Sequence, residues 1–218
     1  MDRARGLSQE WLKIIACVTM LVDHIGAVFF PWQTELRIVG RLAFPIYCFL
    51  LAEGMARTRD VKKYGIRLAI GAVLAEVPFD LLFFRGLTLA HQSVMVTLLI
   101  GYVMVLWMRR FPKWHGFQVC ICALAAELLC TDYGALGVLI ITLFVLTRER
   151  KHRLLIQTAM LAVLNWWLNG YWVQMFAVAA MIPIALYSGR KSTYGRTIQW
   201  IFYLFYPVHL LVLLLLRG

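Results

Sequence analysis

Nine apolar stretches, each bounded by charged or turn-forming residues, follow one another along the 218-residue chain. They span residues 12–30, 36–56, 64–84, 94–108, 117–129, 134–146, 154–168, 171–187 and 198–216. Several of the middle stretches are shorter than the roughly 20 residues that a bilayer crossing needs, so their ends are approximate. The pattern predicts an all-α, polytopic integral membrane protein with about nine transmembrane helices.

The composition points to the same class. Hydrophobic residues make up 62% of the chain and charged residues only 15%, with a mean hydropathy of +0.75, whereas soluble domains are about half apolar and about a quarter charged. The first apolar stretch is too long for a signal peptide and lacks a small-residue cleavage site, so we expect it to remain as a helix. No linker, low-complexity tract or internal repeat is visible, and residues 1–218 are predicted to form a single transmembrane domain.

The basic residues predict the orientation of the helices, because short loops rich in Lys and Arg stay in the cytoplasm. With the N-terminus inside, 18 of the 22 Lys and Arg residues fall on the cytoplasmic side. The outer side receives Arg37, Arg85 and Arg217, and Arg41 falls within a helix. We therefore expect a multi-pass protein of the bacterial cytoplasmic membrane with its C-terminus outside. The orientation accounts for the net charge of +11, so a nucleic-acid partner is not implied.

Cysteine positions do not predict disulfides or a metal site. Four of the five cysteines fall within predicted helices, and Cys120 and Cys122 would lie about 200° apart around their helix, which excludes them as a ligand pair. We expect no metal.

Ionisable residues gather at one depth in the predicted helices. Counting about 1.5 Å per residue from the outer helix ends places Arg41 roughly 7.5 Å, His24 roughly 9 Å and His209 roughly 10 Å below the outer boundary, with Asp80 and Glu76 nearby. Ionised groups at such depth face the helix bundle or a wet cavity and pair with one another. The layer predicts an outward-facing polar cavity. Pro45 should kink the second helix near Arg41, because proline lacks the N–H that would bond the Arg41 carbonyl.

Three segments carry a resemblance to a known family. The stretches LKIIACVTMLVDHIGAVFFP, LRIVGRLAFPIYCFLLAEG and KKYGIRLAIGAVLAEVPFDLLF are similar to the TraX family, densely over about residues 11–84 and then in the islands HQSVMVTLLIG, TDYGALGVL and FYPVHLL. TraX is named for a conjugal-transfer protein associated with N-terminal acetylation of pilin. It is grouped with the wider membrane acyltransferases, which include the acyltransferase 3 family and heparan-alpha-glucosaminide N-acetyltransferase. One departure is Arg57-Thr58-Arg59-Asp60, where the family often has His-Thr-Arg-Asn.

The resemblance implies acyl transfer from cytoplasmic acetyl-CoA to an amine or hydroxyl acceptor outside, either a peptide N-terminus or a glycan. His24 would be the general base, because imidazole titrates near neutrality. Asp23 would support it, although adjacent helical residues point about 100° apart, and Arg41 would stabilise the oxyanion. Cations for the coenzyme A phosphates would be Arg57, Arg59, Lys62, Lys63 and Arg67. The predicted substrate-binding residues are Glu76, Asp80, Gln92, Asp132 and His209.

Other interpretations of these residues stay open. His24 and Arg41 could belong to a structural network, His209 could be a core histidine, and the basic cluster could serve only to orient the chain. Glu53 could simply pair with Arg57 at i, i+4. A proton-coupled transporter would also use an intramembrane Asp/His/Glu layer as a relay, although no inverted repeat of the kind common in transporters is visible. The acceptor, and the choice between direct transfer and a covalent His24 intermediate, stay open as well.

Overall fold

The computed structural model describes residues 6–169, 172–190 and 196–218. Its helices are α1 (Gln9–Phe29), α2 (Thr34–Gly40), α3 (Ala43–Arg57), α4 (Val61–Phe84), α5 (Val94–Arg110), η2 (Pro112–Trp114), α6 (His115–Leu128), α7 (Gly134–Thr147), α8 (Arg153–Asn169), η3 (Trp172–Ala180), α9 (Met181–Ala185) and α10 (Arg196–Arg217). Each of the nine predicted apolar stretches contains helix. Within the described ranges the only strand-like pairings are the isolated bridges Leu7–Tyr187 and Gln92–Thr131, so the predicted all-α class is confirmed.

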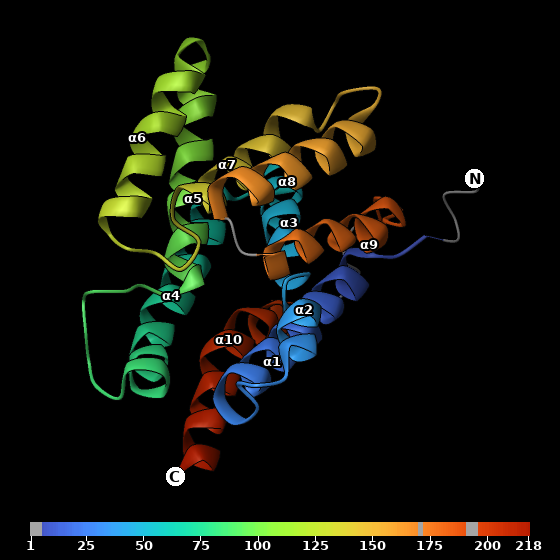
Figure 1. Cartoon of the computed structure of the whole chain (residues 1–218). Helices are drawn as coiled ribbons and strands as arrows, with labels where there is room; N and C mark the ends of the chain where they lie inside the picture. The colour runs from blue at the N-terminus through green and yellow to red at the C-terminus, as the bar shows by residue number, and fades with distance from the viewer. Residues whose placement is uncertain (1–5, 170–171, 191–195) are drawn as a thin grey trace.

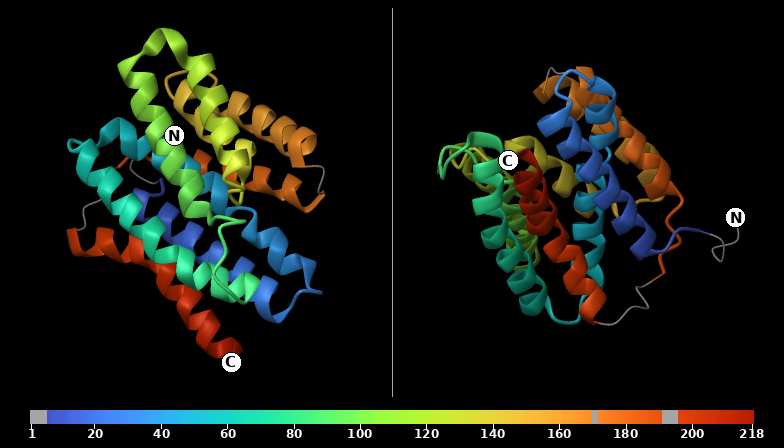
Figure 2. Two further views of the ribbon diagram at one scale, coloured as in Figure 1. Left: turned by 90° about the vertical axis from the view of Figure 1, so that its left-hand side faces the viewer. Right: turned by 90° about the horizontal axis from the view of Figure 1, so that it is seen from below.

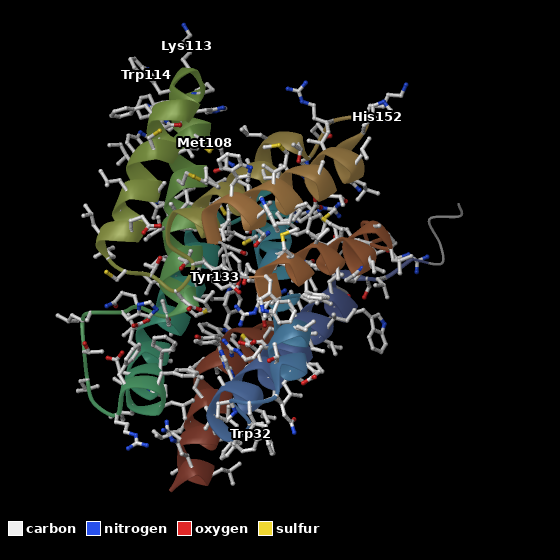
Figure 3. All side chains as sticks on the ribbon, in the orientation of Figure 1. Trp32, Met108, Lys113, Trp114, Tyr133 and His152 are labelled. Carbon is white, nitrogen blue, oxygen red and sulfur yellow. The ribbon has the colours of Figure 1, made fainter. Side chains whose placement is uncertain are left out.

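Three helical segments of the described residues are long and apolar enough to cross a membrane: α1, the combined α2 and α3, and the Gln199–Arg217 part of α10. Two shorter apolar segments, α7 and Trp172–Ala185, accompany them. The count of nine crossings and the orientation of the termini stay predictions. Figure 3 shows Lys113 and His152 at one end of the molecule and Trp32 at the other. We call these the inner and the outer end, after the predicted orientation.

The helices pack around a core that draws on distant parts of the sequence. Helix α10 lies beside both α4 and α1 (Figures 1 and 2), and α3 packs against α1, α5 and α7. The α5–α6 hairpin extends to one side of this group (Figure 1). Fully buried side chains from α1, α3, α7 and α10 meet in the core, among them Leu12, Ile46, Ile141 and Leu210.

Apolar side chains also cover much of the outer surface. Val73, Leu155 and Leu215 are each more than 70% exposed, and they come from three different helices. In water such widely spread exposed apolar area would cost free energy, whereas against lipid it costs none. The surface is that of a membrane protein.

The second predicted helix is broken at Arg41. Helix α2 ends at Gly40 and α3 begins at Ala43, with Pro45 in the first turn of α3. Proline cannot donate a bond to the Arg41 carbonyl, and its ring would crowd that carbonyl in a continuous helix. The predicted kink is therefore confirmed, and it places Arg41 at a helix end, where its side chain is free to turn inward.

Glycines let α1 and α2 approach closely beside this break. A Cβ on Gly40 would overlap the Asp23 side chain, and a Cβ on Gly26 would lie 2.7 Å from the Leu36 Cβ. The atoms met include the Cβ atoms of Asp23 and Leu36, which are fixed to their backbones, so the helices themselves would have to separate.

We expect Gly40→Ala to destabilise the protein by about 1–3 kcal/mol, the usual cost of overfilling a tightly packed site. Thermal unfolding of the purified variant in detergent measures the effect. Gly116→Ala is the matched control, because a Cβ on Gly116 meets nothing within 4 Å. Equal unfolding temperatures for the two variants would show that the α1–α2 approach does not depend on Gly40.

Candidate functional site

A cavity of about 350 Å³ lies between α1, α2, α3, α4 and the loops that follow α4 and α6. Aromatic rings form much of its wall, including Phe44, Tyr47, Phe83 and Tyr133. Figure 3 shows Tyr133 between the two ends of the molecule. The polar groups that line the cavity are Asp23, His24, Arg37, Arg41, His91 and Asp132. His91 and Asp132, in the two loops, are about 40% exposed (39% and 42%), so these loops form the mouth.

His24 is paired with a second histidine from the last helix. Its Nδ1 lies 2.7 Å from Nε2 of His209, and Nδ1 of His209 lies 2.7 Å from the carbonyl oxygen of Phe205. A carbonyl can only accept, so Nδ1 of His209 carries the proton and its Nε2 accepts from Nδ1 of His24. Neutral His24 is thereby left with a lone pair on Nε2. This is the form of imidazole that can act as a base.

Asp23 belongs to a different network, although it is adjacent to His24 in sequence. Its carboxylate accepts from Arg37 at 2.7 Å and from Arg41 at 2.8 Å, and Arg37 also donates to the Asp23 backbone carbonyl. Arg41 also donates a hydrogen bond to Oε1 of Gln174 at 3.1 Å. Both carboxylate oxygens thus bind guanidinium groups, and the role of Asp23 is to hold Arg41 rather than to orient His24. Two cations share one anion, so the cluster keeps a net positive charge beside the cavity.

Four of the five predicted substrate-binding residues do not line the cavity. They are Glu76, Asp80, Gln92 and His209, and His209 contacts the cavity residue His24 instead. Asp80 is 5% exposed and accepts from the Thr88 backbone N–H at 2.9 Å. The expectation that Asp80, His24 and Arg41 converge on one cavity open outward is therefore wrong for Asp80. Glu76 accepts from the backbone N–H and the hydroxyl of Ser93. The Asp80 and Glu76 carboxylates therefore hold the loop after α4 and do not face the cavity, because the backbone N–H groups of that loop need acceptors.

Gln92 joins the two loops of the mouth through its backbone. Its N–H donates to the Cys130 carbonyl at 3.1 Å, and its carbonyl accepts from the Asp132 N–H at 2.9 Å. Its side chain donates to Leu89 within its own loop. Asp132, in contrast, lines the cavity as predicted.

The predicted coenzyme A-binding cations at the inner end make separate contacts and do not gather around one site. Arg57 pairs with Glu53 at 2.8 Å, the i, i+4 contact that the sequence left open, and lies over the Tyr187 ring. Lys63 pairs with Asp60, whose carboxylate also accepts from the Lys63 N–H at the start of α4. Arg59 and Lys62 are exposed. Arg67 lies over the Tyr203 ring of α10, 5.6 Å from its centroid.

Sequence reasoning missed several participants in the site, including Arg37, His91 and Tyr133. Arg37 precedes Arg41 by four residues, a spacing that places both on one helix face and could have identified it. Tyr133 stacks on Phe44 with ring centroids 3.6 Å apart, and no local signal predicts that a loop residue reaches the wall of the cavity.

The His91–Asp132 pair at the mouth predicts a dependence on pH. Nε2 of His91 lies 4.0 Å from the Asp132 carboxylate, which favours the imidazolium and raises the pKa of His91 above its ordinary value. A raised folded-state pKa gives stability that is fully present below the unfolded pKa, near 6.5, and is lost as the pH rises through the folded value.

We expect the unfolding temperature to fall more between about pH 6 and about pH 8 in the wild type than in Asp132→Asn, because that variant lacks the carboxylate. These two pH values lie on either side of the ordinary histidine pKa, about 6.5. Thermal scans in the same detergent at both pH values measure the difference. Asp60→Asn removes an exposed carboxylate at the inner end and should keep the wild-type response. An unchanged response in Asp132→Asn would mean that the pair does not stabilise the mouth.

Comparison with known proteins places the chain in a family. The family model described as TraX protein matches residues 8–217. The probable fimbrial assembly protein FimC, serogroup H1, of Dichelobacter nodosus is 30% identical over 98% of this chain and 97% of that protein. Protein TraX of Escherichia coli is 25% identical over 94% of this chain and 85% of its own length. No solved structure matches. Since the family model covers nearly the whole chain and the helices, the cavity and the DHIG motif fall within the match, the protein belongs to the TraX family.

Proposed function

We propose that the protein is a membrane acyltransferase, which moves an acetyl group from acetyl-CoA to an acceptor at the outer end. The observation that carries the proposal is the state of His24. Its hydrogen bond to His209 leaves Nε2 unprotonated in a cavity that also contains the guanidinium of Arg41. A base and a cation on one cavity wall are the two groups that acyl transfer requires.

The proposed reaction uses each group once. The acceptor nitrogen or oxygen attacks the thioester carbonyl carbon while Nε2 of His24 takes the acceptor proton. Negative charge moves to the carbonyl oxygen, where Arg41 stabilises it. The carbon–sulfur bond then breaks, and the coenzyme A thiolate leaves and takes the proton from His24. The products are the acetylated acceptor and free coenzyme A, and His24 returns to its starting form.

Asp23 supports this chemistry through Arg41. A single cation above an aromatic wall would be free to rotate, whereas Arg41 is held at three points: Asp23, Gln174 and the Arg37 carbonyl. Fixed groups stabilise developing charge better than mobile ones, since they need not reorganise during the reaction.

The acceptor that we propose is the amino terminus of a fimbrial subunit. One relative is named as a probable fimbrial assembly protein, and the resemblance to TraX implies an association with N-terminal acetylation of pilin. A cavity of about 350 Å³ lies at the small end of the range for ligand sites, about 300–1,000 Å³. The cavity is large enough for the first residues of the acceptor subunit, and the rest of that subunit would remain outside the mouth.

The test is the release of coenzyme A by the detergent-purified protein. A peptide with a free amino terminus should stimulate release from acetyl-CoA, and the same peptide with a formylated terminus should not. Glycan acceptors provide the comparison for hydroxyl transfer. Failure to consume acetyl-CoA with every acceptor would contradict the proposal. Proton flux into sealed liposomes without an acyl donor would instead support a transporter.

A further inference from the structure

Three phenylalanines of α4 line the main cavity, and the proposed chemistry uses none of them. They are Phe79, Phe83 and Phe84. The centroid of the Phe79 ring lies 5.2 Å from that of Phe83 and 5.9 Å from that of Phe84. Rings at these distances are in contact and form one apolar surface. We call these three residues the phenylalanine face.

His91 extends the phenylalanine face to the mouth of the cavity. Its ring centroid lies 6.4 Å from that of Phe79 and 5.6 Å from that of Phe84. Phe79 is almost fully buried, whereas Phe84 remains 47% exposed. An exposed ring that lines a cavity gains free energy when an apolar group of a ligand covers it.

The proposed base lies against the same face. The His24 ring is 5.5 Å from the Phe83 ring, centroid to centroid, in an edge-on arrangement. In a peptide, the first side chain branches from the carbon that carries the amino nitrogen. A peptide whose amine reaches His24 therefore brings its first side chain close to Phe83. The surface that this side chain meets there is apolar.

Arg37 lines the cavity from α2 and keeps donors free. Its Nη1 makes both bonds to Asp23, at 3.0 Å to the backbone carbonyl and 2.7 Å to the carboxylate. Within the described residues, Nε and Nη2 of Arg37 have no hydrogen-bond partner, and the side chain is 34% exposed. Unused guanidinium N–H groups need an acceptor oxygen. In a peptide the oxygen nearest to the terminal amine is the first carbonyl.

Resting on the proposed function, we infer that the main cavity recognises the first residue of the acceptor peptide and prefers a large apolar side chain at that position. The side chain packs on the phenylalanine face, Arg37 donates to the first peptide carbonyl, and the amine meets His24. The contacts come from α4, α2 and α1, so they fix the orientation of the residue as well as its identity. A lysine side-chain amine or a sugar hydroxyl has no carbonyl in the corresponding place.

A series of peptides tests the preference for the first side chain. The peptides are identical except for Gly, Ala, Leu or Phe at the first position. Their equilibrium binding to the protein in nanodiscs is measured without an acyl donor, and binding to empty nanodiscs is subtracted. The Phe peptide should bind at least about tenfold more tightly than the Gly peptide, because a large apolar side chain leaves water. Equal binding across the series would overturn the inference.

Phe84→Ala tests the phenylalanine face, with Phe117→Ala as the matched control. Phe84→Ala should lower the ratio of Phe-peptide to Gly-peptide affinity at least about threefold, because one ring contact is lost. The ratio compares two peptides on one variant, so a general loss of binding cancels. Phe117 is 56% exposed in the first turn of α6 and does not line the cavity, so its removal should keep the wild-type ratio. Equal ratios in the two variants would overturn the inference.

Arg37→Met tests the carbonyl contact. Phenethylamine has the amine and the ring of phenylalanine amide but no carbonyl, and it should bind the wild type at least about tenfold more weakly. In Arg37→Met this ratio should fall toward one. The matched control is Arg85→Met, which removes an exposed arginine of the outer end that does not line the cavity and should keep the ratio. A wild-type ratio in Arg37→Met would contradict the contact.

Failure of the proposed function gives a different pattern. Peptides that bind in the expected order but release no coenzyme A from acetyl-CoA would refute acetyl transfer and leave the recognition of the first residue standing. Release of coenzyme A with equal kcat/KM for all the peptides, together with equal binding, would refute the inference alone.

Discussion

Replacing His24 with alanine is expected to lower acetyl transfer by about 10²–10⁴-fold, the usual contribution of a positioned general base. His24 lines the cavity and Nε2 is its unprotonated ring nitrogen, and alanine leaves no group to take the acceptor proton. The measurement is the rate of coenzyme A release at saturating acetyl-CoA and acceptor peptide. Acetyl-CoA binding should persist, since the substitution removes the base and leaves the other side chains in place.

His115→Ala serves as the control, because His115 begins α6 at the inner end and contributes nothing to the cavity. Transfer by His24→Ala at the wild-type rate would remove His24 from the mechanism while leaving the family assignment intact. His209→Ala should cause a smaller loss and shift the pH profile of kcat, because His24 would lose the acceptor that fixes its tautomer. A purely structural role for His209 would lower stability without moving that profile.

Asp23→Asn is expected to cost about 3 kcal/mol of stability and about 10²–10³-fold in rate. Removing one member of a largely buried ion pair leaves its partners uncompensated, and here two guanidinium groups lie within 3 Å of the carboxylate. The rate falls because Arg41 loses its anchor and no longer meets the developing oxyanion. Thermal unfolding and the rate of coenzyme A release measure the two effects separately.

The matched control for this substitution is Asp60→Asn, which makes the same chemical change in an exposed pair with Lys63. Exposed pairs contribute little, about 0–1 kcal/mol, and asparagine is also a good helix N-cap. Adding Arg37→Met to Asp23→Asn should recover part of the stability, because one surplus cation is removed, but little of the rate. Equal stability of Asp23→Asn and Asp60→Asn would show that the buried cluster is not what holds α1 to α2.

The helices and the common level of His24 and His209 were predictable because both follow from local rules. Apolar runs of membrane length leave few choices but helix, and a fixed rise per residue converts position into depth. His24, Arg41 and His209 were placed at one level in this way, and the structure brings His24 and His209 into contact. The kink at Arg41 followed equally from the chemistry of Pro45.

The choice of partners was not predictable, because it depends on how helices rotate against one another. Asp23 and His24 are adjacent, yet Asp23 pairs with Arg37 on α2 and with Arg41 just after it, while His24 pairs with His209 on α10, 185 residues further along the chain. Asp80 has the right depth but is captured by a backbone donor in the loop after α4. Sequence position fixes how deep a residue lies. Packing decides which neighbour it meets.

The backbone bridge between Gln92 and the Cys130–Asp132 segment joins the two loops at the mouth of the cavity into one unit rather than two independent flaps. Main-chain bonds set its width, so the α4–α5 and α6–α7 connections must move together when an acceptor enters. Side-chain substitutions along the rim would then alter which chain ends fit, while the aperture itself would keep its size.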